Sequence, residues 1–501
     1  MTAVPFAKAA GLFQFPLHCI LDYAIPHIFG CGYASRQPRA EVKIMKKVDF
    51  ENGKILKNIL QTAIPMLLAQ VLSLLYSIVD RIYIGRIPGS GTQALGAVGL
   101  CFPIILIVAG FTNMFGMGGG PLFSIALGRG DREKADQLQN TALRLLVITA
   151  VLLTILTELF GGFMLRLFGA SGSELPLTLP YLRIYIAGTV FQMVSAGMGP
   201  FIIAQGYSLI SMASVAAGAV ANLILDPVFI FGLGLGVEGA AAATVISQFL
   251  AAAVTMSFFL SRKNEFPLLP GRALPYAGEI MSLGLAPFIM QVTNSMVQIA
   301  CNNVLMNFGG PDYVSIMTIV SSVRSILDTP VQAVTEGTSP IISYNYGARR
   351  PANVRRAIKI MAGIALIYTS SVWLVLFVRP QWFVRIFSSD PMLMHNCARA
   401  LHLYFYAFVF QTLQYSGQTV FKALNKRKKA IFFSLFRKVI LVVPLTYALP
   451  YLMGMGTDGV FLAEPISNVI GGTACFTTML LTVLPELKEM ENKPEKGKED
   501  L

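Results

Sequence analysis

Residues 221–231, ANLILDPVFIF, are almost wholly apolar but carry a carboxylate in the middle of the run. Asn222 and Asp226 are four residues apart, so they share one face if the segment is helical. Pro227 removes a backbone donor directly after the acid and crowds the turn before it. A charge in a lipid-spanning helix costs at least about 2.5 kcal/mol and usually faces a cavity or a partner. Asp226 is therefore a candidate functional residue; the alternative is that it only supports the proline break through a local hydrogen bond.

The composition places the chain in lipid. Of its 501 residues, 54% are hydrophobic and only 13% are charged, whereas soluble proteins carry about 25% charged residues. We predict an all-α polytopic membrane protein whose solvent is the lipid bilayer. The net charge of +13 lies mainly in short segments between apolar runs, a distribution that is not typical of a nucleic-acid-binding surface. The six cysteines form no CxxC pair, so we expect packing residues and no disulfide framework.

Twelve apolar runs begin near residue 57, and each can cross a hydrocarbon layer of about 30 Å. They lie at 57–80, 93–117, 138–163, 178–204, 210–232, 238–260, 280–307, 314–342, 356–377, 398–422, 430–453 and 459–483. Lysine and arginine gather before the first run and after the second, sixth, eighth and tenth, which all fall on one side of the membrane. This asymmetry predicts a multi-pass protein of the plasma (inner) membrane with both termini in the cytoplasm.

The chain also repeats itself at an offset of about 220 residues. The matched pairs include Pro65 with Pro287, Gly128 with Gly347, Phe191-Gln192 with Phe410-Gln411, and Gly236–Gly239 with Gly456–Gly459. Six spans per copy is an even number, so the two copies have the same orientation. An axis along the membrane normal then relates them, and the substrate path is expected between them, which is typical of a transporter.

We therefore predict twelve transmembrane helices in two pseudo-symmetric six-helix bundles. The predicted parts are an N-terminal extension and cytoplasmic lead-in at 1–54, the two bundles at 55–260 and 279–484, a cytoplasmic linker at 261–278, and a charged cytoplasmic tail at 485–501. Residues 1–44 contain an apolar stretch that is interrupted by Pro16, Asp22 and Pro26. It is a poor spanning helix and lacks the basic start of a signal peptide, so we assign it no function.

Buried acids do not follow the repeat. Asp80 aligns with Asn302, and Asp226 aligns with the uncharged stretch around Thr446, so only the N-terminal bundle holds acids at these positions. At a rise of about 1.5 Å per residue, Asp226 lies about 22 Å into its span, past the midplane. Asp80 and Thr244 fall in the same outer half of the bundle.

Asp80, Asn222, Asp226 and Thr244 together offer two carboxylates, an amide oxygen and a hydroxyl. These are hard oxygen ligands, which suit a small cation such as Na⁺. The same carboxylates could carry a proton instead, and the sequence leaves both uses open. No histidine or cysteine spacing indicates another metal site or a cofactor.

Other buried charges lie in the C-terminal half. Arg324 and Asp328 are four residues apart near mid-membrane, where a mutual ion pair is expected. Glu336 could line a cavity or reach the interface, and Glu464 is equally ambiguous. The sequence otherwise places few cations within the spans, chiefly Arg324.

These residues resemble the multidrug and toxic compound extrusion (MATE) exporters over about 55–484. The resemblance rests on the twelve spans in two halves, Pro65 ahead of Asp80, and Asn222-Leu-Ile-Leu-Asp226-Pro227. It also rests on 236–244, GVEGAAAAT, and 340–348, PIISYNYGA.

The resemblance implies export of small cationic, amphipathic organic compounds in exchange for Na⁺ or H⁺, by alternating access and without a cofactor. It also implies that Asp80, Asn222, Asp226 and Thr244 form the cation site. One branch of the family carries a glutamate in span seven, whereas residues 291–295 here, QVTNS, contain none. We expect a monomer that meets lipid and small molecules only.

Two other classes of protein are alternatives. A flippase for lipid-linked saccharides would have similar architecture, but it would be expected to line its cavity with several cations for pyrophosphate. A membrane enzyme or receptor is the other alternative. No nucleophile elbow, HExxH or phosphate-binding loop occurs, so we expect no enzyme.

Overall fold

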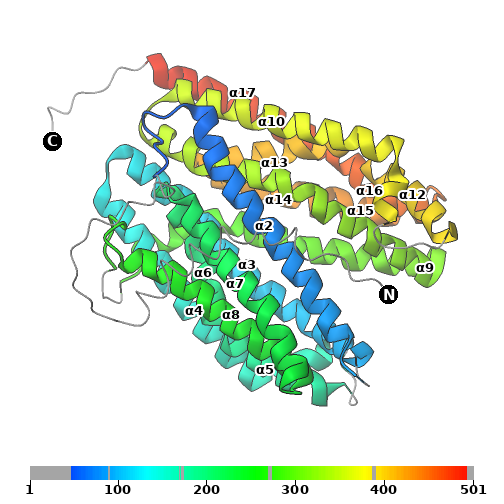
Figure 1. The fold of residues 1–501 in the computed structure, drawn as a ribbon. Coiled ribbons are helices and arrows are strands. Elements are labelled where there is room, and N and C mark those ends of the chain that lie inside the picture. The colour runs from blue at the N-terminus through cyan, green and yellow to red at the C-terminus, as the bar shows by residue number, and fades with distance from the viewer. Residues whose placement is uncertain are drawn as a thin grey trace, which may run out of the picture. The chain divides into compact units, whose positions relative to one another are not determined.

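The computed structural model describes residues 47–88, 91–168, 170, 174–268, 273–385 and 391–492. Within these ranges the regular secondary structure is helical and no strand occurs. The expectations for residues 1–44, and for the part of the charged tail after 492, lie outside the described residues. Figure 1 shows the helices along the chain.

The helices of the N-terminal half match the predicted runs closely. Their bounds are α2 Ile55–Gly85, α3 Gly91–Arg129, α4 Arg132–Leu167, α5 Leu175–Ala187, α6 Thr189–Ala204, α7 Ser208–Pro227, η2 Val228–Gly232 and α8 Gly236–Leu260. The helices α5 and α6 are bent by 50° at the intervening Gly188 and form one broken span. Helix α8 packs on α5, α6 and α7.

The C-terminal half begins with one very long helical segment. Its bounds are α9 Ala277–Gly347, α10 Pro351–Val378, α11 Pro380–Val384, α12 Pro391–Phe405, α13 Phe408–Ala423, α14 Arg427–Leu435, η3 Phe436–Val442, α15 Val443–Tyr451, α16 Gly456–Ser467, η4 Asn468–Gly472 and α17 Thr473–Asn492. Gly310, with φ +69°, interrupts α9 and separates two spans. Three segments, η2, η3 and η4, are π-helical.

Twelve membrane crossings follow from these elements. In the described ranges, nine helices are long and apolar enough to span a bilayer, and the bent pair α5–α6 makes a tenth. The break at Gly310 divides α9 into two spans, and α12 with α13 completes the set. The predicted all-α, twelve-span fold is therefore confirmed.

The chain separates into two compact units. Among the described residues, the first unit comprises 47–48, Leu68–Gly116 and Asp136–Ala277. The second unit comprises Asp49–Leu67, Met117–Ala135 and residues 278–492. Helix α2 therefore belongs to the second unit before Leu68 and to the first unit after it. The change falls three residues beyond Pro65, which lies inside α2.

The backbone shows the internal repeat directly. Residues with positive φ recur in pairs about 220 positions apart. These pairs are Gly130 with Arg349, Gly206 with Asn425, Gly234 with Gly454, and Gly236 with Gly456. The break between α5 and α6 likewise recurs between α12 and α13. The two halves therefore share the same turns as well as the same order of helices.

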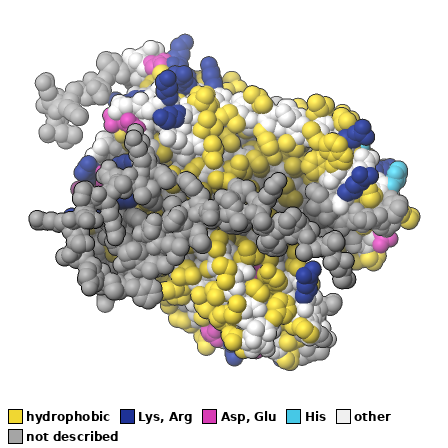
Figure 2. Space-filling model, in the orientation of Figure 1, with side chains coloured by type: hydrophobic (Ala, Val, Ile, Leu, Met, Phe, Trp, Pro, Cys, Tyr) yellow, Lys and Arg dark blue, Asp and Glu magenta, His cyan; other side chains and the backbone are white. Residues whose placement is uncertain are grey.

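Hydrophobic side chains cover much of the visible surface of both units, whereas lysine and arginine gather mainly near helix ends (Figure 2). On α4, Leu152, Ile155, Leu159 and Phe163 are all exposed, with Leu159 at 70%. Their spacing places them on one face of the helix. A broad apolar outer face of this kind is expected where helices meet lipid instead of water. The four described cysteines are buried and unpaired, as expected for packing residues.

Two repeat-related glycines allow helices to meet closely inside the second unit. A Cβ atom on Gly128 of α3 would lie 2.0 Å from the Tyr344 carbonyl oxygen of α9. A Cβ atom on Gly347 of α9 would lie 2.1 Å from the Ile125 carbonyl oxygen of α3. Such close backbone approach is the use that membrane helices make of small residues.

We expect Gly128→Ala to destabilise the protein, because the added methyl group would meet backbone that cannot rotate away. The loss should be about 1–3 kcal/mol, the usual cost of overpacking. Thermal unfolding of the purified protein measures it. Gly363→Ala on α10 is the matched control, since nothing lies within 4 Å of a Cβ atom there. Equal unfolding temperatures for the two variants would contradict the packing argument.

Candidate functional site

Three helices of the first unit bring the four predicted residues together. Asn222 and Asp226 lie on α7, and the Asn222 amide donates to Asp226 Oδ1 over 3.0 Å. The same amide donates to Thr244 Oγ1 on α8 over 3.4 Å. Asp80 on α2 lies within hydrogen-bonding reach of Asp226. The two carboxyl groups thus face each other, with the amide and the hydroxyl beside Asp226.

This site has more buried acceptors than donors. Asp80 Oδ1, Asn222 Oδ1 and Asp226 Oδ2 are all buried and have no hydrogen-bond partner in the described protein. A buried acceptor without a partner costs about 1–3 kcal/mol. Arg81, the neighbouring cation, is exposed and lies over the Phe102 ring at 5.9 Å, with no salt bridge to Asp80. The oxygens therefore suit a small hard cation or protons.

The backbone beside Asp226 leaves the α-helical pattern. Pro227 ends α7, and the π-helical segment η2 follows it directly. Single π-helical turns are rare and often mark functional sites. Gly239 on α8 permits this arrangement, because a Cβ atom there would lie 2.7 Å from the Phe229 carbonyl oxygen. The proline was visible in the sequence, but the π-helical turn was not.

Polar side chains next to the two acids were not predicted from the sequence. Tyr181 and Tyr185 on α5 are both buried and close enough to feel the charge of Asp80. The Tyr185 hydroxyl donates to Gln192 Oε1 over 3.3 Å, and Gln248 on α8 also hydrogen-bonds this tyrosine. The two tyrosines could have been identified from their four-residue spacing within a predicted span, because this spacing places both on one helix face.

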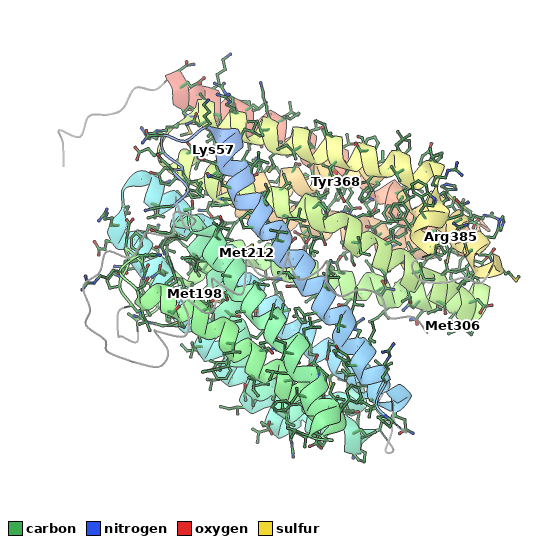
Figure 3. All side chains as sticks on the ribbon, viewed as in Figure 1. Lys57, Met198, Met212, Met306, Tyr368 and Arg385 are labelled. Atoms are coloured by element: carbon green, nitrogen blue, oxygen red, sulfur yellow. The ribbon has the colours of Figure 1, made fainter. Side chains whose placement is uncertain are left out.

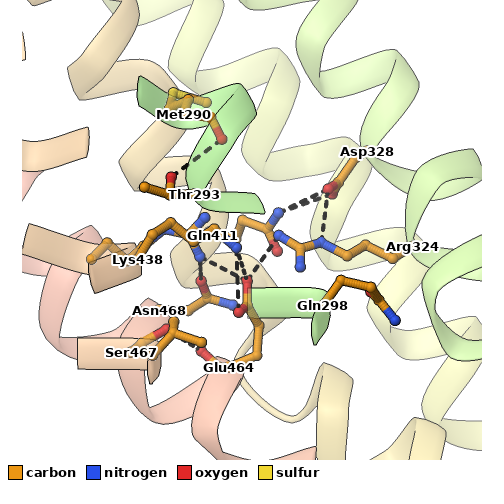
Figure 4. Close-up of polar contacts among 12 residues, drawn as sticks. Met290, Thr293, Gln298, Arg324, Asp328, Gln411, Lys438, Glu464, Ser467 and Asn468 are labelled. Carbon is orange, nitrogen blue, oxygen red and sulfur yellow. Dashed lines mark hydrogen bonds and ion pairs between the residues drawn. The ribbon is translucent and has the colours of Figure 1, made fainter. Parts of the chain in front are cut away.

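A network of five buried charges occupies the second unit (Figure 4). Arg324 and Asp328 form the ion pair that their spacing indicates, with Nε and Oδ2 3.2 Å apart. Arg324 also contacts Glu464 Oε1 at 2.8 Å and donates to the Tyr404 hydroxyl over 2.6 Å. Gln411 donates to both oxygens of Asp328, over 3.1 and 2.9 Å. Each nitrogen of the Arg324 guanidinium thus has a partner.

The remaining two cations of this network were missed. Arg437 and Lys438 are buried in the π-helical segment η3, so the expectation that Arg324 is the chief cation within the spans was wrong. Arg437 Nη1 contacts Glu464 Oε1 at 2.8 Å, and Lys438 Nζ contacts the same oxygen at 3.1 Å. Both residues are adjacent in the predicted span 430–453, and two consecutive cations within a span could have indicated a buried ionic site. Glu464 is the centre of an ionic cluster.

The ambiguous Glu336 lies apart from this cluster. It feels the charge of Lys422 on α13, although no salt bridge joins the two side chains. Figure 3 labels Tyr368, which lies on α10. The Tyr368 hydroxyl donates to the Leu327 carbonyl oxygen over 3.3 Å. This contact ties α10 to the part of α9 that carries the ion pair.

The repeat-equivalent positions of the acidic site are neutral in the second unit. Asn302, the counterpart of Asp80, accepts from Gln298 over 3.1 Å. Thr446, the counterpart of Asp226, lies 3.9 Å from the Cys301 sulfur. The two units thus use different positions for their buried charges. The described residues contain no cluster of three or more His, Cys, Asp or Glu side chains suited to a metal ion.

Twelve apolar spans from two related halves, with ionisable groups held inside each half, define a multi-pass membrane transporter. The MatE family model matches residues 65–228 and 287–448, which is more than half of the chain. The chain belongs to this family of multidrug efflux transporters. Members of the family are transporters, so the protein is not an enzyme.

Two relatives with similar sequences agree with this family. The "Multidrug export protein MepA" of Staphylococcus haemolyticus is 27% identical over 81% of this chain and 89% of its own length. The protein of the same name from Staphylococcus aureus is 24% identical over 81% of this chain and 90% of its own length.

Solved structures share the fold. One described as an outward-facing multidrug resistance MATE family transporter has a TM-score of 0.82 at 22% identity. It covers 89% of this chain and 99% of its own. Another, described as MATE in the bent conformation, has a TM-score of 0.83 at the same identity and coverage.

We expect Asp226→Asn to raise the apparent Tm of the protein in sodium-free buffer at alkaline pH. The change removes one of two facing carboxylates and keeps a side chain that can accept the Asn222 hydrogen bond. The rise should be about 2 °C or more. Asn222→Asp serves as a control with the opposite expected effect. It adds a third carboxylate to the site and should lower the Tm. A fall in Tm for Asp226→Asn would show that the two acids do not repel each other.

In the second unit, Glu464→Gln should destabilise the protein strongly, because it leaves Arg324, Arg437 and Lys438 with Asp328 as the one remaining acid of the cluster. Removing one partner from a buried ionic group costs about 3–5 kcal/mol. Thermal unfolding and the yield of monodisperse protein measure the effect. Glu158→Gln provides the control, because that acid forms an exposed salt bridge with Arg183. Similar behaviour of the two variants would contradict the central role of Glu464.

Proposed function

We propose that the protein is a secondary antiporter that exports cationic, amphipathic organic compounds in exchange for Na⁺ or H⁺. It acts in the cell membrane as a monomer, with both termini in the cytoplasm. The repeats 55–260 and 279–484 alternate access to the substrate path. No cofactor takes part, and the coupling ion binds at Asp80, Asn222, Asp226 and Thr244.

One observation carries this proposal. Two buried carboxyl groups, Asp80 and Asp226, face each other and retain oxygens without hydrogen-bond partners. Like charges held together in an apolar unit repel, so a bound cation or proton is favoured. The Asn222 amide orients Asp226 and Thr244 and leaves its own oxygen available as a ligand. The site is therefore prepared to exchange positive charge.

Helix α2 supports the coupling step. It carries Asp80 within the first unit, and its part before Leu68 packs within the second unit. Neutralising Asp80 changes the forces on a helix that both units share, and Pro65 weakens the hydrogen bonding of that helix near the boundary. Cation binding lowers the affinity for the drug, and the drug lowers the affinity for the cation to the same degree.

The relatives support the substrate class, since two proteins that are 24–27% identical to this chain are named multidrug export proteins. A multidrug exporter needs surfaces that adapt to different compounds, and the 22 methionines of the chain suit that need. Two buried carboxylates without a salt-bridge partner in the described residues favour compounds that carry a positive charge.

The alternative is a flippase for lipid-linked saccharides. The buried Arg324, Arg437 and Lys438 are the observation that favours it, because such cations could bind pyrophosphate. All three contact the Glu464 carboxylate, however, and Arg324 has a partner for each of its nitrogens. A doubly charged pyrophosphate would have to displace these internal acids, so export of organic cations is the better proposal.

Dye efflux from proteoliposomes tests the proposal. One arm imposes a Na⁺ gradient at equal pH, and the other imposes a pH gradient without Na⁺. Asp226→Asn should reduce gradient-driven efflux by about tenfold or more, because the variant cannot exchange positive charge at the site. Glu238→Gln, an exposed change on the helix that carries Thr244, should leave efflux unchanged.

The two gradients also identify the coupling ion, since only the coupled ion should drive efflux. Unchanged efflux by Asp226→Asn would remove this residue from the mechanism. Binding of dye without export under either gradient would contradict antiport and favour the flippase.

A further inference from the structure

The buried ionic cluster of the second unit does not balance its charge. Arg324, Arg437 and Lys438 carry three positive charges, whereas Asp328 and Glu464 supply two negative ones. No other carboxylate lies within 4 Å of any of these cations in the described parts of the chain. Side-chain exposure is 17% or less for every member. With all five side chains ionised, the cluster therefore carries one more positive than negative charge inside a membrane-embedded unit.

Hydrogen-bond donors are also in excess, and at the same place. Within the described structure, Arg437 bonds through Nη1 alone, to Glu464 and to Asn468, the latter over 2.7 Å. Its Nε and Nη2 groups are left without protein acceptors. Lys438 Nζ has three donors, and Glu464 is its one partner. Arg324, in contrast, uses every nitrogen of its fork.

The backbone holds these donors in a fixed place. Arg437 and Lys438 are consecutive in η3, and Asn468 begins the neighbouring π-helical segment η4. Gly471 of η4 accommodates the arginine, because a Cβ atom there would lie 3.0 Å from Arg437 Cγ. π-Helical segments are rare, and they frequently occur at functional sites.

We propose that Arg437 and Lys438 form a binding site for a monovalent anionic group, such as chloride or a carboxylate. One bound negative charge would balance the cluster and accept the spare N–H groups. The group has a single charge because the surplus is a single charge. Chloride from solution and the carboxylate of a zwitterionic cargo share this chemistry. The site is separate from the acidic site of the first unit.

Apparent Tm measurements on the purified full-length protein test the site. Chloride or acetate replaces methanesulfonate at constant ionic strength, cation concentration and pH. We expect a saturable rise of about 2 °C or more for the wild type, as a ligand of the folded state requires. A rise with chloride alone indicates an inorganic anion, whereas a rise with both ions indicates that a cargo carboxylate also fits. If neither chloride nor acetate raises the Tm of the wild type, the proposal is overturned.

Lys438→Met supplies the decisive comparison, because it removes the surplus charge and a spare donor while keeping a similar length. The variant should fold without the anion and lose the chloride-dependent and acetate-dependent shift. Lys428→Met, an exposed change on α14, should keep the wild-type shift. An equal anion effect in Lys438→Met and the wild type would place the anion elsewhere and overturn the assignment.

Discussion

Charge balance among apolar helices is the constraint on which the rest of this structure depends. A charge removed from water costs several kcal/mol unless a partner compensates it. The first unit concentrates negative charge at Asp80 and Asp226, and no cation of the described protein forms a salt bridge with either acid. The second unit concentrates positive charge around Glu464. Each unit thus leaves a residual charge that only something from outside the protein, or the loss or gain of a proton, can remove.

Both residual charges stand beside irregular backbone. The segment η2 follows Asp226, η3 carries Arg437 and Lys438, and η4 begins at Asn468. A π-helical turn disturbs the regular hydrogen-bond ladder and re-aims side chains. Glycine allows tightly packed helices to accommodate these irregular segments, as at Gly239 and Gly471, where a Cβ atom would lie 3.0 Å or less from a neighbouring atom. Irregular backbone therefore lies beside both groups of buried charges.

The repeat explains how one fold accommodates two different ionic sites. The turns with positive φ and the broken spans recur in both halves, so the backbone frame is shared. The charges do not recur, because Asn302 and Thr446 replace the acids at the equivalent positions. Side-chain chemistry diverged on a common frame, as expected when function resides in particular sites and not in the fold itself.

Much of the fold and the acidic site followed from the sequence alone. Long apolar runs can satisfy their backbone only as helices in lipid, and the repeat set their order. An acid inside such a run is costly enough to be noticed, which is why Asp80 and Asp226 were identified. The tertiary structure alone decided that these two acids, 146 positions apart, face each other across α2 and α7.

The tertiary structure also determined the role of Glu464, which the sequence did not indicate. Arg437 and Lys438 were not identified from the sequence, and Glu464 stood by itself in the last span. Folding brings the three together because η3, which carries both cations, packs against α16, which carries Glu464. The sequence by itself determined which groups are expensive to bury, since that cost belongs to the residue. Only the packing of helices determined which of them share their charge, since that depends on distance.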